Sequence, residues 1–243
     1  MCGRFSLATP AKEWAALFEV ESPDVSPRYN IAPTQDIIAV RAAAGGAGQG
    51  GADAQTCPSR EVEREVVELR WGLVPFWARS PDFEASTFNA RSETAASRPA
   101  FREPLRHRRC LIPADGFYEW TAAGKHRQPH WIHRPGERPF AFAGLWDSWT
   151  SPEGSLNSCT ILTTRANEVL LPIHPRMPVI LDEADFARWL DPALTDPDRL
   201  EDLLAPFPSE KLRVRAVDPR VNRTSFDSPE CLLPTEQQGN LFS

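Results

Sequence analysis

The 243-residue sequence has few cysteines and no paired cysteine spacing. Its five cysteines are an odd number and contain no CxxC motif, which argues against a disulfide framework and against a zinc site of that type. A GxGxxG fingerprint, a P-loop and an HExxH motif are also missing. We therefore expect reduced thiols, no metal and no cofactor.

A long apolar run and a positive net charge are missing as well. Residues 1–20 contain Arg4, Lys12 and Glu13, so we expect neither a signal peptide nor a membrane anchor, and a cytoplasmic location. The net charge of -6 argues against a protein that coats nucleic acid by charge alone. The arginine-rich segment 101–110 still leaves a locally basic groove open.

Short strands dominate the predicted secondary structure. The sequence holds 24 prolines and eight tryptophans, and its β-branched or aromatic runs are short and end at Pro, Gly or Asp. This pattern predicts the α+β class, with one compact domain (1–235) around a curved, mostly antiparallel or mixed, open barrel-like sheet with peripheral helices. The predicted strands are DIIAVRA, EVVELRWG, RRCLIPA, PHWIHR, PFAFAGLW, SCTILTT, MPVIL and LRVRAV.

Three helices are predicted. In TPAKEWAALFEV, Thr9 is a candidate N-cap, Pro10 takes the first helical position, and an apolar face follows at Trp14, Leu17 and Phe18. The segments DEADFARWL and DPDRLEDLL have the same character. The Gly/Ala-rich stretch 42–61 is predicted to be a loop between two hairpin strands, and 236–243 to be a polar tail.

A cysteine directly follows the initiator methionine in the opening segment MCGRF. Removal of Met1 is expected when the second residue is small, and it would leave an amine and a thiol on adjacent carbons of Cys2. The thiol alone attacks carbonyls in amino-terminal-nucleophile hydrolases. Both groups together condense with an aldehyde to give a thiazolidine. A cysteine placed there by chance is the simpler alternative.

Four further polar residues are candidates for chemistry. Glu119 lies among aromatic residues in DGFYEW, where lost hydration would raise its pKa and suit it to acid/base work; a water-facing glutamate is the alternative. His174, between prolines ahead of an apolar run, is either a proton shuttle or a turn donor. Asn89 and Arg91 share one face if extended, offering an amide for an amine or oxyanion and a guanidinium for phosphate or a surface salt bridge.

Taken together, these segments resemble the SOS response-associated peptidase family, which are DNA repair proteins that crosslink to abasic sites. The resemblance runs through most of the chain in the family's order. The matching segments are MCGRF, RYNIAPTQ (28–35), RWGLVPFWA (70–78), NARSET (89–94), CLIPADGFYEW (110–120), ILTT (161–164) and HPRMPVIL (174–181).

The resemblance implies a role for each candidate. Cys2 resembles the crosslinking nucleophile, Asn89 the residue that positions its freed amine, Glu119 the acid/base residue and His174 the residue that assists opening of the sugar. DNA contacts are implied at Arg4, Asn30, Pro33, Trp77, Arg91 and Thr163. Some family members have two adjacent tryptophans as a wedge between bases, whereas here Ala78 follows Trp77, so the wedge is predicted to be narrower.

The function implied is that of a sensor of abasic sites in single-stranded DNA. It would form a covalent thiazolidine crosslink that shields the lesion during the DNA damage response, with weak lyase activity and a peptidase activity limited to its own Met1 or to later release of the linkage. We expect a nucleoid-associated monomer that is compatible with replication-associated partners.

Three other classes of protein compete with this interpretation. A class II glutamine amidotransferase also begins Met-Cys-Gly, but its downstream motifs and a second catalytic domain are not found. A cysteine peptidase would combine Cys2 with His174 and Asn89 and would cut exogenous peptides. A non-enzymatic DNA-binding module would keep its function after Cys2→Ala.

Overall fold

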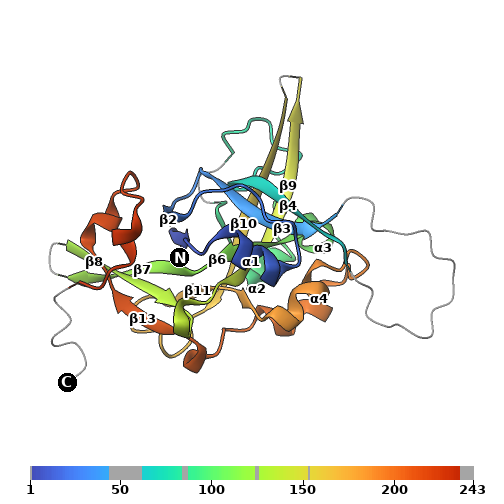
Figure 1. Ribbon diagram of the computed structural model, residues 1–243. Helices are drawn as coiled ribbons and strands as arrows, with labels where there is room; N and C mark the ends of the chain where they lie inside the picture. Colours follow the sequence, from blue (N-terminus) through green and yellow to red (C-terminus); the bar gives the residue numbers. More distant parts are fainter. Residues whose placement is uncertain (1, 44–61, 84–86, 124–125, 153, 236–243) are drawn as a thin grey trace.

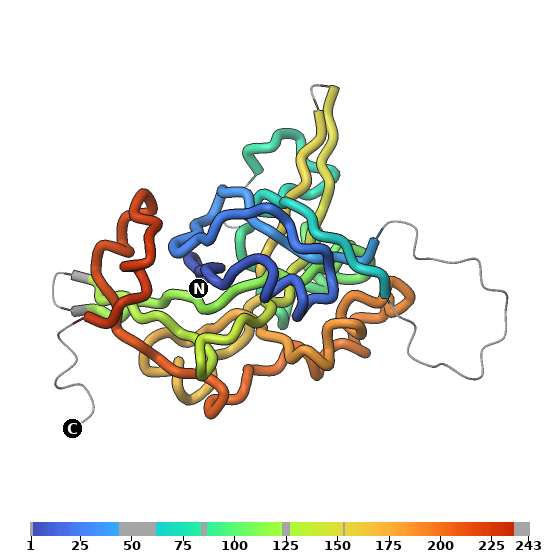
Figure 2. Tube along the Cα trace, in the orientation of Figure 1, coloured from blue at the N-terminus to red at the C-terminus, as the bar shows by residue number. Residues whose placement is uncertain are grey.

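The computed structural model describes residues 2–43, 62–83, 87–123, 126–152 and 154–235. Two β-sheets pack against each other, and short helices lie around them (Figures 1 and 2). The predicted α+β class with a mostly antiparallel, barrel-like sheet is confirmed. The strands are divided over two sheets, and the barrel is closed, not open.

Five strands form the closed barrel. Strand β9 pairs with both β10 and β6, and the ring is completed through β3 and β4, of which β4 pairs with β10 in parallel and the others pair antiparallel. Three short strands extend this sheet beside β10 and β9. The barrel strands are β3 (Asp36–Ala42), β4 (Arg64–Trp71), β6 (Arg109–Ala114), β9 (Phe140–Ser151) and β10 (Gly154–Arg165), and the attached strands are β5 (Asn89–Arg91), β11 (Arg176–Pro178) and β12 (Ile180–Leu181).

The second sheet is antiparallel throughout and carries the amino-terminal end of the chain. Its strands run in the order β13, β8, β7, β1, β2. Their bounds are β1 (Phe5–Leu7), β2 (Arg28–Ile31), β7 (Gly116–Ala123), β8 (His126–His133) and β13 (Arg213–Ala216). The backbone N–H of Tyr118 also bonds the carbonyl of Arg4 at 2.9 Å, which extends the β1–β7 pairing toward Cys2.

This second sheet is covered on both faces, which explains why consecutive residues of β7 are buried. Phe117 belongs to the main core shared with the barrel, whereas Tyr118 belongs to a smaller core with Trp131, Val221 and Cys231. We call residues 218–232 the C-terminal segment. It contains the 3-10 turns Pro219–Asn222 and Pro229–Leu232, and it lies over the outer face of β7 and β8 (Figure 1).

The helices are short, as the proline content predicts. Helix α1 (Ala11–Phe18) buries Trp14 and Phe18, but Pro10 is its N-cap and Ala11 its first residue, so the predicted N-cap at Thr9 is wrong. The N–H of Thr9 instead bonds the Asp115 carboxylate. The remaining helices are α2 (Ser92–Ala95), α3 (Arg102–His107), α4 (Phe186–Leu190) and 3-10 turns at Pro135–Glu137, Glu183–Asp185, Pro197–Leu204 and Ser209–Lys211.

The predicted 42–61 loop can be compared with the structure only in part, and the predicted DPDRLEDLL helix can be compared in full. Strands β3 and β4 are antiparallel neighbours, as expected for the strands on either side of 42–61, while 44–61 and the tail 236–243 lie outside the described residues. The segment DPDRLEDLL forms a 3-10 helix whose Asp196 side chain accepts from the N–H of Asp198. Among the described helices none is long and apolar enough to cross a membrane.

Candidate active site

Cys2 lies just ahead of β1, where the two sheets meet, and its side chain is fully buried. The side-chain amide of Asn89 donates to the Cys2 carbonyl oxygen at 2.7 Å. Asn89 begins β5, which pairs with barrel strand β10, so the contact joins the barrel to the amino-terminal sheet. Burial raises the pKa of the Cys2 thiol, and the carboxylate of Glu119 raises it further.

Glu119 lies on β7 and is only 3% exposed. Burial raises the pKa of its carboxyl, while nearby positive charges, that of His174 among them, act in the opposite direction. Because the charge of Glu119 raises the pKa of the Cys2 thiol, the two side chains lie in the same part of the site. The predicted loss of hydration at Glu119 is confirmed by its burial.

His174 is half-buried in the connection between β10 and β11. Its Nδ1 accepts the backbone N–H of Arg176 at 3.0 Å. The same Nδ1 lies 3.1 Å from the carbonyl oxygen of Arg176, so the Arg176 backbone fixes the position of the ring without selecting one tautomer. The ring is near enough for its positive charge to lower the pKa of Glu119.

Asn89 is 8% exposed, and its two amide atoms differ in their surroundings. The nitrogen is bonded to Cys2, whereas the oxygen Oδ1 is buried without a hydrogen-bonding partner among the described residues. A buried acceptor without a donor carries a free-energy cost of roughly 1–3 kcal/mol. The oxygen is therefore suited to receive a donor that is brought in by a ligand or by chain processing.

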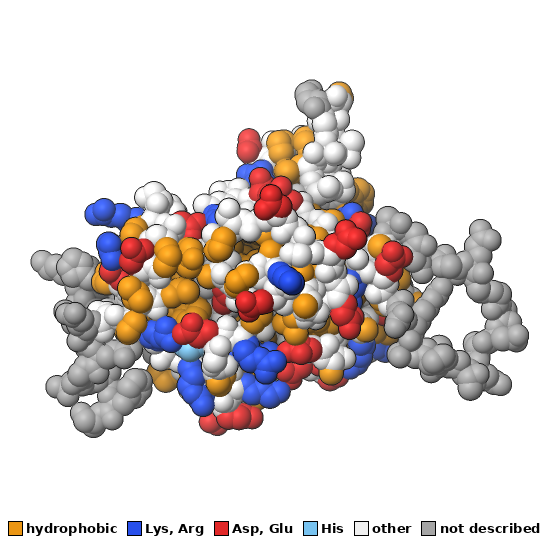
Figure 3. Space-filling model, in the orientation of Figure 1, with side chains coloured by type: hydrophobic (Ala, Val, Ile, Leu, Met, Phe, Trp, Pro, Cys, Tyr) orange, Lys and Arg blue, Asp and Glu red, His pale blue; other side chains and the backbone are white. Residues whose placement is uncertain are grey.

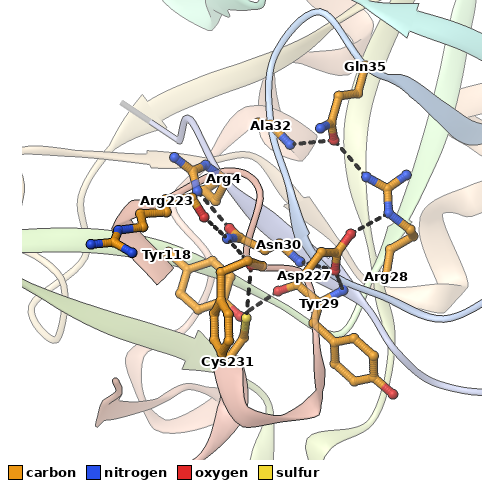
Figure 4. A network of polar contacts seen from close by, with 11 residues as sticks. Arg4, Arg28, Tyr29, Asn30, Ala32, Gln35, Tyr118, Arg223, Asp227 and Cys231 are labelled. Atoms are coloured by element: carbon orange, nitrogen blue, oxygen red, sulfur yellow. Dashed lines mark hydrogen bonds and ion pairs between the residues drawn. The ribbon is translucent and has the colours of Figure 1, made fainter. Parts of the chain in front are cut away.

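Arg4 lies two residues beyond Cys2 and contacts the C-terminal segment. Its Nη1 donates to the side-chain oxygen of Asn30 at 2.7 Å and to the carbonyl of Val221 at 2.9 Å. The guanidinium also lies 5.8 Å from the ring centre of Trp120. Figure 4 shows Arg4 and Asn30 directed toward each other, with further hydrogen bonds running on from Asn30.

The segment RYNIAPTQ provides structure around Arg4. Asn30 is fully buried, so its side chain does not line an open surface. Pro33 is half-buried in the turn between β2 and β3. Gln35 accepts from the N–H of Ala32 at 3.1 Å and from Arg28 at 2.7 Å, which closes the turn.

Arg91 and Thr163 lie opposite each other on parallel strands β5 and β10, but only Arg91 is exposed. The Thr163 hydroxyl is fully buried; it donates to the Ala90 carbonyl at 3.3 Å and accepts from Arg176 at 3.2 Å. Arg176 in turn forms a two-pronged ion pair with Glu93, at 2.8 and 3.0 Å. A second guanidinium, that of the half-buried Arg176, therefore lies at this place beside the exposed Arg91, and it is held by Thr163 and Glu93.

Within the described ranges, the exposed aromatic residues are Phe76 and Trp77, at 56% and 46%. They lie on the connection between β4 and β5, beside the β9–β10 hairpin that projects from the body (Figure 1). The N–H of Phe76 bonds Asp147 and the Trp149 indole bonds the Ala78 carbonyl, which fixes this connection to the hairpin. The chain therefore has two adjacent exposed aromatic residues, as in the family's tryptophan pair. Here the second aromatic residue is Phe76, which precedes Trp77, whereas Ala78 follows it.

Sequence reasoning missed several residues around the site. His130 is 8% exposed and pairs in register with Glu119 across β7 and β8, so their side chains share a face. Burial lowers the pKa of its imidazole, and Nε2 lies 2.9 Å from the Thr121 hydroxyl. The alternation in PHWIHR could have placed His130 on the face of Glu119 once the hairpin register was known. Arg176 was not predicted as a site residue, because the interpretation of the HPRMPVIL segment rested on His174.

The remaining cysteines and the surface charges offer little chemistry. Cys110, Cys159 and Cys231 are buried and unpaired by disulfides. Within the described ranges no His, Cys, Asp and Glu cluster suits a metal ion. On the face drawn in Figure 3, basic and acidic side chains are interspersed, in keeping with the net charge of -6.

The fold and the site define a class of α+β barrel protein that groups a buried cysteine, a carboxyl, an imidazole and an amide near its amino-terminal end. The chain belongs to the SOS response associated peptidase (SRAP) family, whose pattern matches residues 1–224. The expected family is thereby confirmed.

Named relatives and solved structures agree with this assignment. The chain is 37% identical to the abasic site processing protein YoqW of Bacillus subtilis (strain 168) over 238 residues, which cover 96% of this chain and 99% of that protein. It is 36% identical over 199 residues to the abasic site processing protein HMCES of Gallus gallus, covering 72% of this chain and 59% of that protein. A crystal structure of a protein from Bacteroides thetaiotaomicron has the same fold, with a TM-score of 0.74 at 27% identity, over 90% of this chain and 93% of that one.

Proposed function

We propose that this protein processes abasic sites in single-stranded DNA and forms a covalent thiazolidine crosslink to them through Cys2, once Met1 has been removed. The names of the relatives support the substrate, because YoqW and HMCES are both abasic site processing proteins. The observation that carries the chemistry is the grouping of Cys2 with Asn89 and Glu119.

The first chemical step forms an imine. An abasic sugar in its ring-opened form carries an aldehyde at C1. The α-amine of Cys2 adds to this carbon, and loss of one water molecule gives the carbon–nitrogen double bond. The buried Oδ1 of Asn89 lies beside the Cys2 backbone and would accept a hydrogen bond from that amine, holding its lone pair toward the aldehyde.

The second step closes the ring. The Cys2 sulfur adds to the imine carbon, and the thiol proton passes to the nitrogen, so no further water is released. Because burial and the Glu119 charge raise the pKa of this thiol, it needs a base at the moment of attack. Glu119 has a pKa raised by burial, which suits it to exchanging protons near neutrality, and His174 assists opening of the sugar.

Binding of the strand is assigned to the arginines and the exposed aromatic residues. Arg4 and Arg91 would hold phosphates on either side of the lesion, and Trp77, with Phe76 beside it, would stack on neighbouring bases. An abasic site presents no base edge, so recognition rests on phosphates, shape and the aldehyde. Little sequence preference is therefore expected.

The outcome is a shielded lesion. Ring closure uses both nucleophiles of Cys2, so the product resists hydrolysis better than an imine. The imine stage also permits β-elimination, which gives a weak strand-nicking lyase activity. Peptidase activity, suggested by the family's name, is assigned to release of Met1 or later of the linkage.

A denaturing gel tests the proposal. The protein is mixed with a single-stranded oligonucleotide that contains one abasic site, without reductant. A heat-stable shifted band that disappears with Cys2→Ala is expected. Absence of a band from the wild-type protein, or a band that persists in Cys2→Ala, would overturn the proposal. Glutamine hydrolysis or cleavage of added peptides, measured on the same preparation, would instead favour an amidotransferase or a cysteine peptidase.

A further inference from the structure

We propose that Asn30 is a positioning residue for Arg4 and does not itself contact DNA. In this proposal the C-terminal segment holds the Asn30 side chain in place. This inference rests on the proposed function, because it assumes that Arg4 binds a phosphate of the strand. It concerns how the protein keeps one guanidinium oriented for an anion (Figure 4).

Within the described ranges, Arg4 is bonded only to neutral oxygens, unlike its neighbour Arg28. Its Nη1 bonds two neutral oxygens, on Asn30 and Val221, and among the described residues no carboxylate pairs with it. In the part of the chain that the structure describes, its Nη2 forms no hydrogen bond, and its Nε is buried without a hydrogen-bonding partner. By contrast, the charge of nearby Arg28 is neutralised by Asp227 at 2.6 Å. A half-buried cation without a counter-ion is prepared for an anionic ligand, since buried charges are normally paired.

Asn30 is held so that only one orientation of its amide is satisfactory. Its Nδ2 donates to the carbonyls of Val221, Arg223 and Phe226, at 3.2, 3.1 and 2.6 Å. Turning the amide over would point its oxygen at three carbonyl oxygens and its nitrogen at the Arg4 guanidinium. The three carbonyls therefore fix Oδ1 toward Arg4, where it accepts at 2.7 Å.

The C-terminal segment is itself tied to β2. The Asp227 carboxylate accepts from the backbone N–H groups of Tyr29 and Asn30, at 2.6 and 3.0 Å. At the other end of the segment, Asn222 accepts from the Trp120 indole at 2.6 Å. Val221 contributes its carbonyl to both Asn30 and Arg4. A continuous set of hydrogen bonds thus runs from the segment through Asn30 to one edge of the guanidinium.

This arrangement assigns the two edges of Arg4 to different tasks. The edge with Nη1 is bound to protein, and the edge with Nη2 is left for the phosphate. Asn30 is fully buried and cannot reach a strand on the surface, so its effect on DNA passes through Arg4. Loss of Asn30 should then matter only while Arg4 is present.

A double-mutant cycle tests the inference. Affinity for a single-stranded oligonucleotide with one tetrahydrofuran residue, which has no aldehyde and cannot crosslink, is measured by fluorescence anisotropy at several salt concentrations. We expect Arg4→Met to weaken binding about tenfold and to reduce the salt slope by about 0.7. Asn30→Ala should cause a loss of similar size, and the double variant should lose little more than either single variant.

The outcomes separate the inference from the proposed function. If Asn30→Ala binds like the wild-type protein, or if the two losses add, Asn30 does not act through Arg4. If the wild-type protein neither binds this oligonucleotide nor forms an adduct with an aldehyde-bearing one, the proposed function fails and the inference fails with it.

Controls address folding. Arg109→Met is the matched control, because Arg109 is also buried and donates to several backbone carbonyls, but at the ends of α3 and α4, far from the C-terminal segment (Figure 1). It should lower the melting temperature without changing DNA affinity. Should Asn30→Ala not fold, Asn30→Ser replaces it, since a hydroxyl still donates to one carbonyl but does not reach Arg4. Equal loss of affinity in Arg109→Met would overturn the inference.

Discussion

The amide nitrogen of Asn89 lies 2.7 Å from the carbonyl oxygen of Cys2, across the boundary between the barrel and the amino-terminal sheet. Neither residue belongs to the other's sheet, because β5 pairs with β10 whereas the segment after Cys2 pairs with β7. The position of the nucleophile is thus set by the packing of the two sheets as a whole. Substitutions that shift this packing should affect chemistry even when they lie far from Cys2.

An added amino-terminal tag should abolish the stable adduct and leave noncovalent DNA binding in place. The tag converts the Cys2 amine into an amide, which cannot form an imine, while the side chains that bind phosphate are unchanged. The measurement is the denaturing gel together with anisotropy on the tetrahydrofuran oligonucleotide. Proteolytic removal of the tag to leave Cys2 first should restore the band; a band of normal intensity with the tag in place would contradict the role of the amine.

Glu119→Gln should slow adduct formation by about 10²- to 10⁴-fold, the usual contribution of a positioned acid/base group. The amide has the same shape but exchanges no proton. Single-turnover rates at saturating DNA measure the effect, and affinity for the tetrahydrofuran oligonucleotide should change far less. Glu13→Gln, at an exposed position of α1, is the control and should keep the wild-type rate. A change in binding alone would mean that Glu119 has another role.

The same Glu119→Gln variant should become more stable than the wild-type protein as pH rises. Burial raises the pKa of Glu119 in the folded state, so the folded protein binds this proton more tightly than the unfolded chain does. The resulting stability is complete below the carboxyl's ordinary pKa and is lost as pH rises through the raised one. Melting temperatures of both proteins at about pH 4 and pH 8 measure this. A gap that narrows as pH rises would contradict the assigned shift.

Glu93→Gln should tighten binding of single-stranded DNA several-fold. Glu93 neutralises Arg176, and the hydrogen bond from Arg176 lowers the pKa of Glu93, so the Glu93 carboxylate is charged at neutral pH. Removing the carboxylate frees the guanidinium for phosphate, and stability should fall by only about 0–1 kcal/mol. Asp202→Asn, which frees Arg188 from a comparable exposed pair, is the matched control and should leave affinity unchanged. Weaker binding by Glu93→Gln would show that the pair is needed intact.

Phe76→Ala and Trp77→Ala should each weaken binding of single-stranded DNA by about 1–3 kcal/mol, the usual contribution of a stacked base. Both side chains are largely exposed, so melting temperatures should hardly change. Anisotropy at fixed salt measures the affinity. Leu233→Ala provides the comparison, because Leu233 is as exposed as Phe76, at 56%, and no DNA contact is assigned to it. Equal losses at all three positions would show a general surface effect.

Strands with a strong local pattern were predictable, and strands held only by distant partners were not. DIIAVRA coincides with β3 because three β-branched residues follow one another closely after Asp36. β1, β2 and β5 have three or four residues each and were not predicted as strands. Their pairing partners lie far along the chain, as Phe5 with Phe117 shows, so no local periodicity announces them.

In the candidate site, too, features set by neighbouring residues were predictable and features set by distant residues were not. Glu119 was found because its aromatic neighbours are adjacent in sequence, and the structure confirms its burial. The surroundings of Arg4 were not found, since Asn30 bonds the carbonyl of Phe226 across 196 positions. A long separation also explains the mistaken N-cap at Thr9, because the Asp115 carboxylate that accepts its N–H lies 106 positions away, directly after β6. Roles of Asn89 and His174 came from the family resemblance and stay predictions.

The complete burial of Cys2 has a consequence for survival of the protein under oxidative stress. Oxidants attack the thiolate, and burial raises the pKa of this thiol and closes off access to it. Peroxides that damage bases, and so create abasic sites, would oxidise an exposed low-pKa cysteine to a sulfenic or sulfinic acid. We therefore expect Cys2 to resist peroxide longer than an exposed cysteine would, under the very conditions that generate the proposed substrate.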